Sequence, residues 1–249
     1  HFISFLIGLP VYQRYAATYA PTHTHTHTFT KMTDKTLTYQ MNQMCFQPGL
    51  KPKQVISCYD SWSASYDEMM VDGTYNGPKM ALEEVLDHVP VHLRSTCRVL
   101  DVAAGTGQLG TMLASTGFRL LDAVEPSLGM LRILREKNVY NTLYDVYMGN
   151  DDTMIPSDTY DVVVVVGAMG ENHLPVTSVD DMISVTKPGG LVIIVMRKEN
   201  LVTVEAYRDK LQPHMDALVE RGFWKRVTHK VVPYYFCDKD GLVLTYKVL

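Results

Sequence analysis

The sequence has no closely spaced cysteine pair, no surplus of basic residues and no long apolar run. Its four cysteines form no CxxC motif, so neither a disulfide framework nor a zinc site is predicted. The chain carries 23 Lys and Arg residues against 27 Asp and Glu residues, so nucleic acids and anionic membranes are not expected partners. The longest apolar run covers residues 2–11 and falls short of the roughly 20 residues that span a bilayer. These absences favour a protein of the reducing cytoplasm that holds no metal.

The first part of the chain has an unusual composition. Residues 22–28 read THTHTHT, which is either a metal-binding His-rich tract or the translation of a CA-dinucleotide repeat. We favour the repeat, which predicts that residues 1–31 are a disordered leader that need not belong to the natural protein, and that Met32 is the start. Residues 32–56 are polar and lack a sustained period, so we expect a flexible arm there. We place the folded domain at residues 57–249.

Within residues 57–249, short β-branched runs alternate with helical patterns, which indicates βαβ units around a parallel sheet. The predicted strands are residues 98–103, 118–125, 145–147, 161–166 and 191–196. The predicted helices are residues 60–71, 78–89, 107–115, 127–137, 177–186 and 202–221. Residues 225–236 and 242–249 flank a turn and predict a closing hairpin. We therefore expect an α/β fold: a Rossmann-like, seven-stranded, mostly parallel sheet with a C-terminal antiparallel hairpin and helices on both faces.

A turn of small residues follows the first predicted strand. Residues 99–107 read VLDVAAGTG, and small side chains there let a ligand approach the backbone while the next helix offers free N–H groups. Glu125 ends the next predicted strand, 20 residues after Gly105. A carboxylate in that place accepts hydrogen bonds from the two hydroxyls of a ribose. The pair predicts a nucleoside site.

The identity of the nucleoside depends on the charge beside this turn. Residues 105–110 also match the GxGxxG pattern of dinucleotide-binding proteins. Asp101, however, would repel a pyrophosphate and attract an ammonium group. The Tyr-x-x-x-Lys sequence at residues 75–79 contains Gly and Pro and precedes the turn, so it is not the helical catalytic pair of a dehydrogenase. A ligand with an ammonium group, a ribose and no pyrophosphate is S-adenosylmethionine.

Several motifs resemble those of one enzyme family in the same order. VLDVAAGTG resembles motif I of the class I S-adenosylmethionine-dependent methyltransferases, and AVEPSLGML, residues 123–131, resembles their acidic second-strand motif. The sequence YDSWSASYD, residues 59–67, is similar to the helix that precedes motif I in many members. Together with residues 162–175 and 184–197, these motifs most resemble the Williams–Beuren syndrome critical-region methyltransferase-like proteins. The resemblance covers about residues 57–225.

This resemblance implies a set of cofactor-binding residues. Those expected near the methionyl part are Asp101, Ala103, Gly105, Gly107, Val166 and Gly167. Those expected near the ribose and adenine are Glu125, Pro126, Met130 and either Asn150 or Asp151, although Asn150 is equally well a turn residue. Tyr66 and Trp62 are expected to cover the cofactor from the preceding helix, with core packing as the alternative. Alanines replace the first motif glycine and its neighbour, which keeps the loop small.

Methyl transfer from a sulfonium needs alignment and desolvation of the reactants rather than a protein nucleophile. An acceptor that must lose a proton benefits from a general base, and the candidates are Glu171 and His173 in the loop after the valine-rich strand. Their alternative is a solvated loop. Arg197 and Lys198, which follow the fifth strand, are able to attract an anionic acceptor, but we favour ordinary surface charge.

The leading hypothesis is a monomeric S-adenosylmethionine-dependent methyltransferase that acts on a small molecule rather than a protein and yields S-adenosylhomocysteine. A second hypothesis is an S-adenosylmethionine-binding regulatory or interaction protein without turnover, because binding residues alone do not prove catalysis. A remote third hypothesis is an NAD-dependent oxidoreductase.

Overall fold

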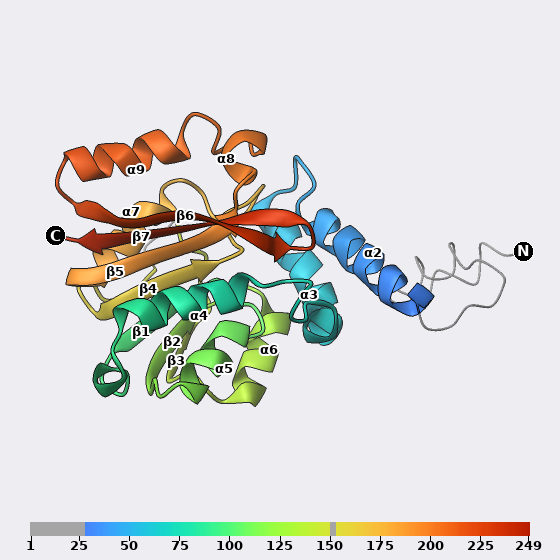
Figure 1. Ribbon diagram of the computed structural model, residues 1–249, viewed down its shortest axis with the longest axis horizontal. Helices are drawn as coiled ribbons and strands as arrows, with labels where there is room; N and C mark the ends of the chain where they lie inside the picture. Colours follow the sequence, from blue (N-terminus) through green and yellow to red (C-terminus); the bar gives the residue numbers. More distant parts are fainter. Residues whose placement is uncertain (1–27, 150–152) are drawn as a thin grey trace, which may run out of the picture.

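A computed structural model describes residues 28–149 and 153–249 and contains one seven-stranded sheet (Figure 1). The strands are β1 (Arg98–Val102), β2 (Leu120–Val124), β3 (Thr142–Tyr144), β4 (Tyr160–Val166), β5 (Thr186–Arg197), β6 (Trp224–Phe236) and β7 (Lys239–Val248). Their order is β3-β2-β1-β4-β5-β7-β6; the first five are parallel, and β7 runs antiparallel to both β5 and β6. The predicted fold class is confirmed.

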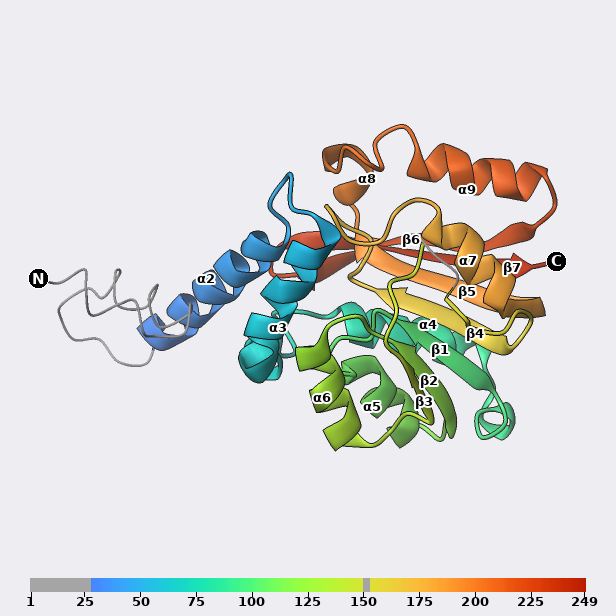
Figure 2. The same ribbon diagram turned by 180° about the vertical axis from the view of Figure 1, so that it is seen from behind.

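Helices cover both faces of this sheet (Figures 1 and 2). They are α2 (Thr28–Cys45), α3 (Pro52–Met69), α4 (Gly77–His88), α5 (Gln108–Ser115), α6 (Leu128–Lys137), α7 (Ser178–Val185), α8 (Asn200–Thr203) and α9 (Leu211–Glu220), with a 3-10 turn at Val91–Leu93. One face packs against α4, α5 and α6, and the other against α7 and α9. In β4, Val163 and Val165 enter one core while Val162 and Val164 enter the other, so the predicted burial of this strand on both faces is confirmed.

Three predicted elements differ from the structure. The third strand is residues 142–144 rather than 145–147, and β5 begins at Thr186, before its Gly turn. The single helix predicted for residues 202–221 is two helices, α8 and α9. The break has a backbone cause: Asp209 has φ 57°, and Pro213 is tolerated only in the first turn of a helix, so α9 begins at Leu211.

The flexible arm predicted for residues 32–56 is wrong over most of its length, because α2 and the start of α3 lie there. Among residues 36–45 of α2, the buried ones are Thr38, Met41, Asn42 and Cys45, which follow the i, i+3, i+4, i+7 spacing of one helix face. Two of these four side chains are polar, so a search for apolar periodicity misses the helix. The predicted leader falls largely on residues 1–27, outside the described residues.

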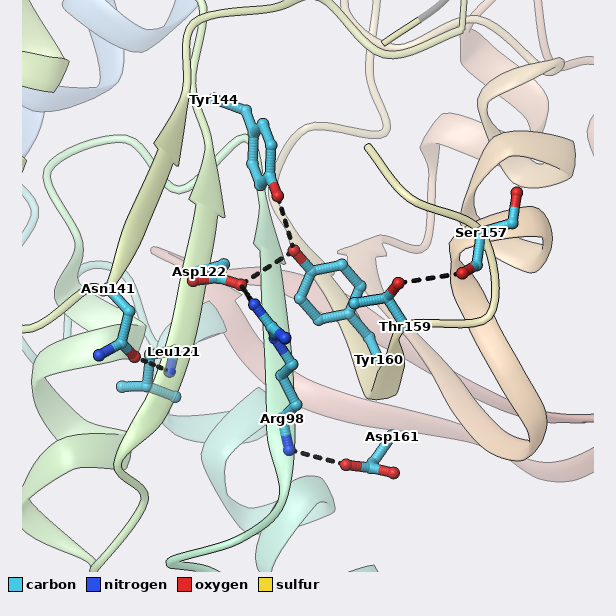
Figure 3. Close-up of polar contacts among 9 residues, drawn as sticks. All are labelled: Arg98, Leu121, Asp122, Asn141, Tyr144, Ser157, Thr159, Tyr160 and Asp161. Carbon is cyan, nitrogen blue, oxygen red and sulfur yellow. Dashed lines mark hydrogen bonds and ion pairs between the residues drawn. The ribbon is translucent and has the colours of Figure 1, made fainter. Parts of the chain in front are cut away.

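The start of the sheet holds a buried ion pair (Figure 3). Arg98 Nε and Nη2 donate to Asp122 Oδ2 at 3.2 and 3.0 Å, and the Tyr160 hydroxyl donates to the same oxygen at 3.0 Å. The Arg98 guanidinium also lies over the Tyr160 ring, 5.6 Å from its centroid. Asp122 is 1% exposed, and no group among the described residues donates to its Oδ1. The guanidinium therefore supplies the countercharge that a buried carboxylate needs.

Candidate functional site

A cavity lies where β1, β2 and β4 end, and α2 and α3 contribute to its walls. Its empty volume is about 1000 Å³, including the part open to solvent. At the strand ends it is lined by Val102, Ala103, Gly105, Val124, Glu125, Pro126, Val166 and Gly167. Ligands of open α/β sheets bind at this edge, because the loops that leave parallel strands diverge there.

The loop after β1 folds tightly against the end of β2. Ala103 has φ 55° and Gly105 has φ 58°, both in the left-handed region. An L-residue such as Ala103 pays roughly 1 kcal/mol for this conformation, which explains the preference for glycine in this motif. Gly107 begins α5, and a Cβ there would lie 2.5 Å from Leu134 Cδ2. Gly107 thus permits the contact between α5 and α6 and does not line the cavity.

Glu125 is the carboxylate that the cavity exposes to a ligand. Its Oε2 accepts from the Gly105 N–H and its Oε1 from the Ser127 N–H, both at 2.8 Å. Each oxygen keeps a further lone pair, so the fixed carboxylate has capacity for two hydroxyl donors. The side chain is buried, and this burial raises the pKa of Glu125 to about 7 despite the two N–H donors.

Asp101 has a different environment from the predicted one. Its Oδ2 accepts from the Tyr140 hydroxyl at 2.6 Å, and its side chain does not line the cavity. Tyr140 itself packs against Gly110, where a Cβ would lie 2.1 Å from the phenol oxygen. Burial raises the pKa of Asp101 to about 7. The structure therefore gives Asp101 a tyrosine partner, and its contact with an ammonium group stays a prediction.

The aromatic residues of α3 divide between cavity and core. Tyr59 and Tyr66 line the cavity, whereas Trp62 is fully buried and does not. The Trp62 ring packs edge-on against Tyr66, with 4.8 Å between ring centroids. Trp62 therefore packs in the core, which is the alternative expected for it, and its contact with the cofactor stays a prediction.

Two aspartates of α3 hold this helix over the cavity, a role that the sequence analysis missed. Asp60 Oδ1 accepts from the Ser127 hydroxyl at 2.7 Å and from the Gly129 N–H at 2.9 Å, which ties α3 to the start of α6. Asp67 accepts from Thr106 at 2.5 Å and from Lys137 at 2.6 Å. Both aspartates belong to the YDSWSASYD motif, so their repetition was the available signal.

Of the remaining residues predicted to bind the cofactor, some line the cavity and others lie outside the described residues. Met130, Val166 and Gly167 line the cavity. At Gly167, with φ 79°, a Cβ would lie 2.5 Å from the Tyr75 hydroxyl, so only glycine fits without displacing that ring. Asn150 and Asp151 lie outside the described residues.

His173 lines the cavity, whereas Glu171 does not. The His173 Nδ1 lies 2.6 Å from the Glu171 carbonyl oxygen, and its Nε2 lies 2.8 Å from the Tyr59 hydroxyl. Because a carbonyl only accepts, Nδ1 carries the proton and Nε2 of the neutral ring accepts from Tyr59. Burial lowers the pKa of His173 to about 4, so the ring is neutral at physiological pH.

Residues distant in sequence complete the far side of the cavity. Arg197, at the end of β5, is 7% exposed and lines it, so the surface-charge interpretation is wrong for this residue. Lys198 is exposed. The other residues here are Asn42, Phe46, Tyr75, Asn200, Tyr235 and Phe236. They come from α2, the loop after it, the turn before α4, α8 and the hairpin, and no local motif marked them.

Among the described residues, no group of three or more His, Cys, Asp and Glu side chains is placed to hold a metal ion. No helix in the same part of the chain is long and apolar enough to cross a membrane. The four cysteines, which all lie in the described part of the chain, form no disulfide bond.

The sheet order, the tight loop after β1 and a match of residues 99–190 to a methyltransferase domain family define a methyltransferase of the Rossmann-like class. Methyltransferase-like protein 27 of Homo sapiens is 32% identical over 174 residues, which are 69% of each chain. The chain therefore belongs to the family of Methyltransferase-like protein 27.

Solved structures of low identity share the fold. The [4+2]-cyclase SpnF has a TM-score of 0.59 and 16% identity over 81% of this chain and 98% of that chain. The 1,6-didemethyltoxoflavin-N1-methyltransferase of Burkholderia thailandensis, with bound 1,6-didemethyltoxoflavin and S-adenosylhomocysteine, has a TM-score of 0.54 and 17% identity over 81% and 92%. At these identities the likeness is one of fold.

Proposed function

We propose that this protein transfers a methyl group from S-adenosylmethionine to a small-molecule acceptor, with S-adenosylhomocysteine as the product. The observation that carries the proposal is Glu125, a buried carboxylate held by two N–H groups with lone pairs free toward the cavity. This carboxylate fits a ribose diol, and the Ala103–Gly105 backbone beside it admits a close ligand.

The residues that line the cavity have separate roles in this reaction. S-adenosylmethionine, when bound, supplies an electrophilic methyl group on a sulfonium. Glu125 orients the ribose, while Pro126 and Met130 offer an apolar surface for the adenine. Gly167 lets the Tyr75 hydroxyl approach the backbone at the end of β4, and Tyr66 lines the cavity on the α3 side, where it helps to exclude water. Alignment and exclusion of water are the main contributions that this reaction requires.

His173 is the candidate general base of the pair predicted from sequence. It faces the cavity as a neutral ring, and the Glu171 carbonyl fixes which nitrogen carries its proton. The Glu171 carboxylate does not line the cavity, so we propose that this residue acts through its backbone. His173 Nε2 takes the acceptor proton directly or through the Tyr59 hydroxyl, 2.8 Å away.

A small-molecule acceptor is supported by the enclosure of the cavity. His173 and Tyr59 are half-buried and line the cavity together with other residues of α2 and α3, so a side chain on a folded protein surface has little access to them. The Burkholderia thailandensis enzyme is a precedent of this kind, because it binds the small molecule 1,6-didemethyltoxoflavin. We propose further that the protein is a cytoplasmic monomer, which light scattering and fractionation test.

Isothermal titration with S-adenosylmethionine, S-adenosylhomocysteine and NAD tests the donor site. We expect both sulfur ligands to bind and NAD not to bind. Glu125→Ala should weaken S-adenosylhomocysteine binding by roughly 10- to 100-fold, since hydrogen bonds to a charged group are worth about 1.5–3 kcal/mol. The matched control is Glu220→Ala, on α9. NAD binding without the sulfur ligands would overturn the proposal.

Turnover is tested separately with a labelled methyl donor and a small-molecule extract. We expect a labelled product from the unaltered protein and a loss of roughly 100-fold with His173→Gln. Donor binding without any labelled product, across extracts, would favour the regulatory protein without turnover.

A further inference from the structure

Arg197 is a buried cation whose partners are unusual. Its guanidinium carbon lies 4.5 Å from the ring centroid of Phe236 and 5.4 Å from that of Phe46. Nη2 donates to Oδ1 of Asn42, a neutral amide. Within the described ranges, 28–149 and 153–249, no carboxylate oxygen lies within 4.0 Å of its nitrogens. The charge is thus held by two ring faces and one amide.

Two other buried side chains, Glu84 and Asp122, have charged partners. Glu84 is 1% exposed and pairs with Lys230 at 2.7 Å, and Asp122 pairs with Arg98. A guanidinium removed from water loses hydration that ring contacts and one amide replace only in part. Arg197 therefore differs from these pairs in having no anion of its own.

An anionic ligand in the cavity would have access to the Arg197 guanidinium. A guanidinium has five N–H donors in one plane, and Asn42 takes one of them. The N–H donors point outward in this plane and the ring contacts use none of them, so its edge keeps donors for further hydrogen bonds. Arg197 lines the cavity, so a ligand in the cavity has access to that edge. Planar donors of this kind match the paired oxygens of a carboxylate or phosphate.

The walls near Arg197 indicate the rest of the ligand. Phe46 stacks on the His173 ring, with centroids 4.2 Å apart, and Tyr235 meets Tyr75 edge-on at 5.4 Å. Such ring walls favour a flat, apolar body. The Tyr75 and Tyr235 hydroxyls also approach the end of β4, since a Cβ at Gly167 would lie 2.5 and 3.1 Å from them. Aromatic rings therefore line the cavity both beside Arg197 and beside the end of β4, where the methyl group is expected.

We propose that the methyl acceptor is a flat molecule that carries an oxyanion, and that Arg197 binds this oxyanion through the open edge of its guanidinium. The inference rests on the proposed function, because it assigns the acceptor half of the same cavity. Carboxylate and phosphate share the required chemistry, and the experiment separates them.

Isothermal titration in saturating S-adenosylhomocysteine provides the test, with benzoate, benzamide and phenyl phosphate as probes. Benzoate and benzamide have nearly the same shape and differ in charge. We expect the unaltered protein to bind benzoate at least tenfold more tightly than benzamide, and the affinity of phenyl phosphate shows which oxyanion is preferred. Arg197→Gln should remove the preference. Lys198→Gln, an exposed neighbour, should keep it.

Asn42→Asp is the decisive second variant, because Arg197→Gln is at risk of losing the packing between Phe46 and Phe236. The new carboxylate lies where Asn42 Oδ1 already contacts the guanidinium, so it supplies an internal anion and keeps the ring contacts. We expect a folded protein whose benzoate preference falls at least fivefold. A retained preference in Asn42→Asp, or equal binding of benzoate and benzamide by the unaltered protein, would show that Arg197 is a structural clamp.

The affinity for S-adenosylhomocysteine is measured for every variant. If the unaltered protein does not bind it, the proposed function fails. If it binds while benzoate shows no advantage over benzamide, only the assignment of the acceptor fails.

Discussion

Charged side chains at the two ends of the sheet differ in whether they have a partner of opposite charge. Where β1 and β4 begin, the buried Asp122 faces Arg98 at 3.0 Å, and the half-exposed Asp161 faces Lys187 at 2.7 Å (Figure 3 shows the first pair). Where the strands end, Glu125 and Arg197 are buried and neither has a partner of opposite charge among the described residues. The first arrangement stabilises the fold without a ligand, whereas the second leaves hydrogen-bonding capacity that a ligand completes.

The largest effect expected from this comparison is on stability. Arg98→Gln leaves Asp122 buried without its cation, and breaking such a pair should lower the free energy of unfolding by about 3 kcal/mol, toward the low end for buried pairs because Arg98 is partly exposed. Arg197→Gln removes a charge that has no partner, so we expect a change of less than about 1 kcal/mol. Urea denaturation of both variants measures the difference.

Benzoate should stabilise one of these two variants and not the other. In the presence of S-adenosylhomocysteine it should raise the melting temperature of the unaltered protein and of Arg98→Gln, but not that of Arg197→Gln. Equal losses of stability in the two variants would contradict the distinction between a structural and a ligand-binding arginine.

The second expected effect is on pH dependence, through Glu125. Burial raises its pKa from 4.5 to about 7, so the folded state favours the protonated form. Its contribution to stability is present at acidic pH, below the unfolded value, and is lost as the pH rises through about 7. Ribose hydroxyls donate to the ionised carboxylate, so the affinity for S-adenosylhomocysteine should fall about tenfold from pH 8 to pH 6.

Glu125→Gln is the matched control, because it keeps the shape and removes the titration. Its affinity curve should be flatter than that of the unaltered protein between pH 6 and pH 8. Asp101 has a similarly raised pKa, so Asp101→Asn is measured alongside to assign any slope that remains. Curves of equal slope for the unaltered protein and Glu125→Gln would show that the carboxylate does not bind the donor in its ionised form.

The same comparison shows which features the sequence was able to predict. The positions of the strands and of Glu125 depend on local sequence. β-branched runs mark the strands, and a residue that directly follows β2 lies at the edge of the sheet where the cavity opens. The cap of α6 is local too, since the Ser127 hydroxyl accepts from the Met130 N–H at 3.2 Å. These features need only neighbouring residues, and the sequence predicts Glu125 and the strands, although β3 and the start of β5 lie elsewhere than expected.

The environment of Arg197 depends on segments far apart in sequence. Asn42 and Phe46 reach it from the N-terminal side and Phe236 from the hairpin, so nothing near position 197 distinguishes it from the exposed Lys198. For Trp62 the motif suggests contact with a ligand, but its position on α3 places the side chain in the core. Burial is set by tertiary packing, and one sequence gives little information about it.

The smallest expected effect concerns Asp67. Unlike Asp122 and Glu125, it is half-exposed, and it has a charged partner in Lys137. Hydrogen bonds from Lys137 and Thr106 lower its pKa although partial burial opposes them. Its stabilisation is therefore present above the ordinary carboxyl pKa and is lost as the pH falls through the lowered value. Asp67→Asn should destabilise by about 1 kcal/mol at pH 7, a modest value because the ion pair is open to solvent. Hydrogen exchange should show the loss first in α3, and an unchanged rate there would mean that Asp60 alone holds this helix over the cavity.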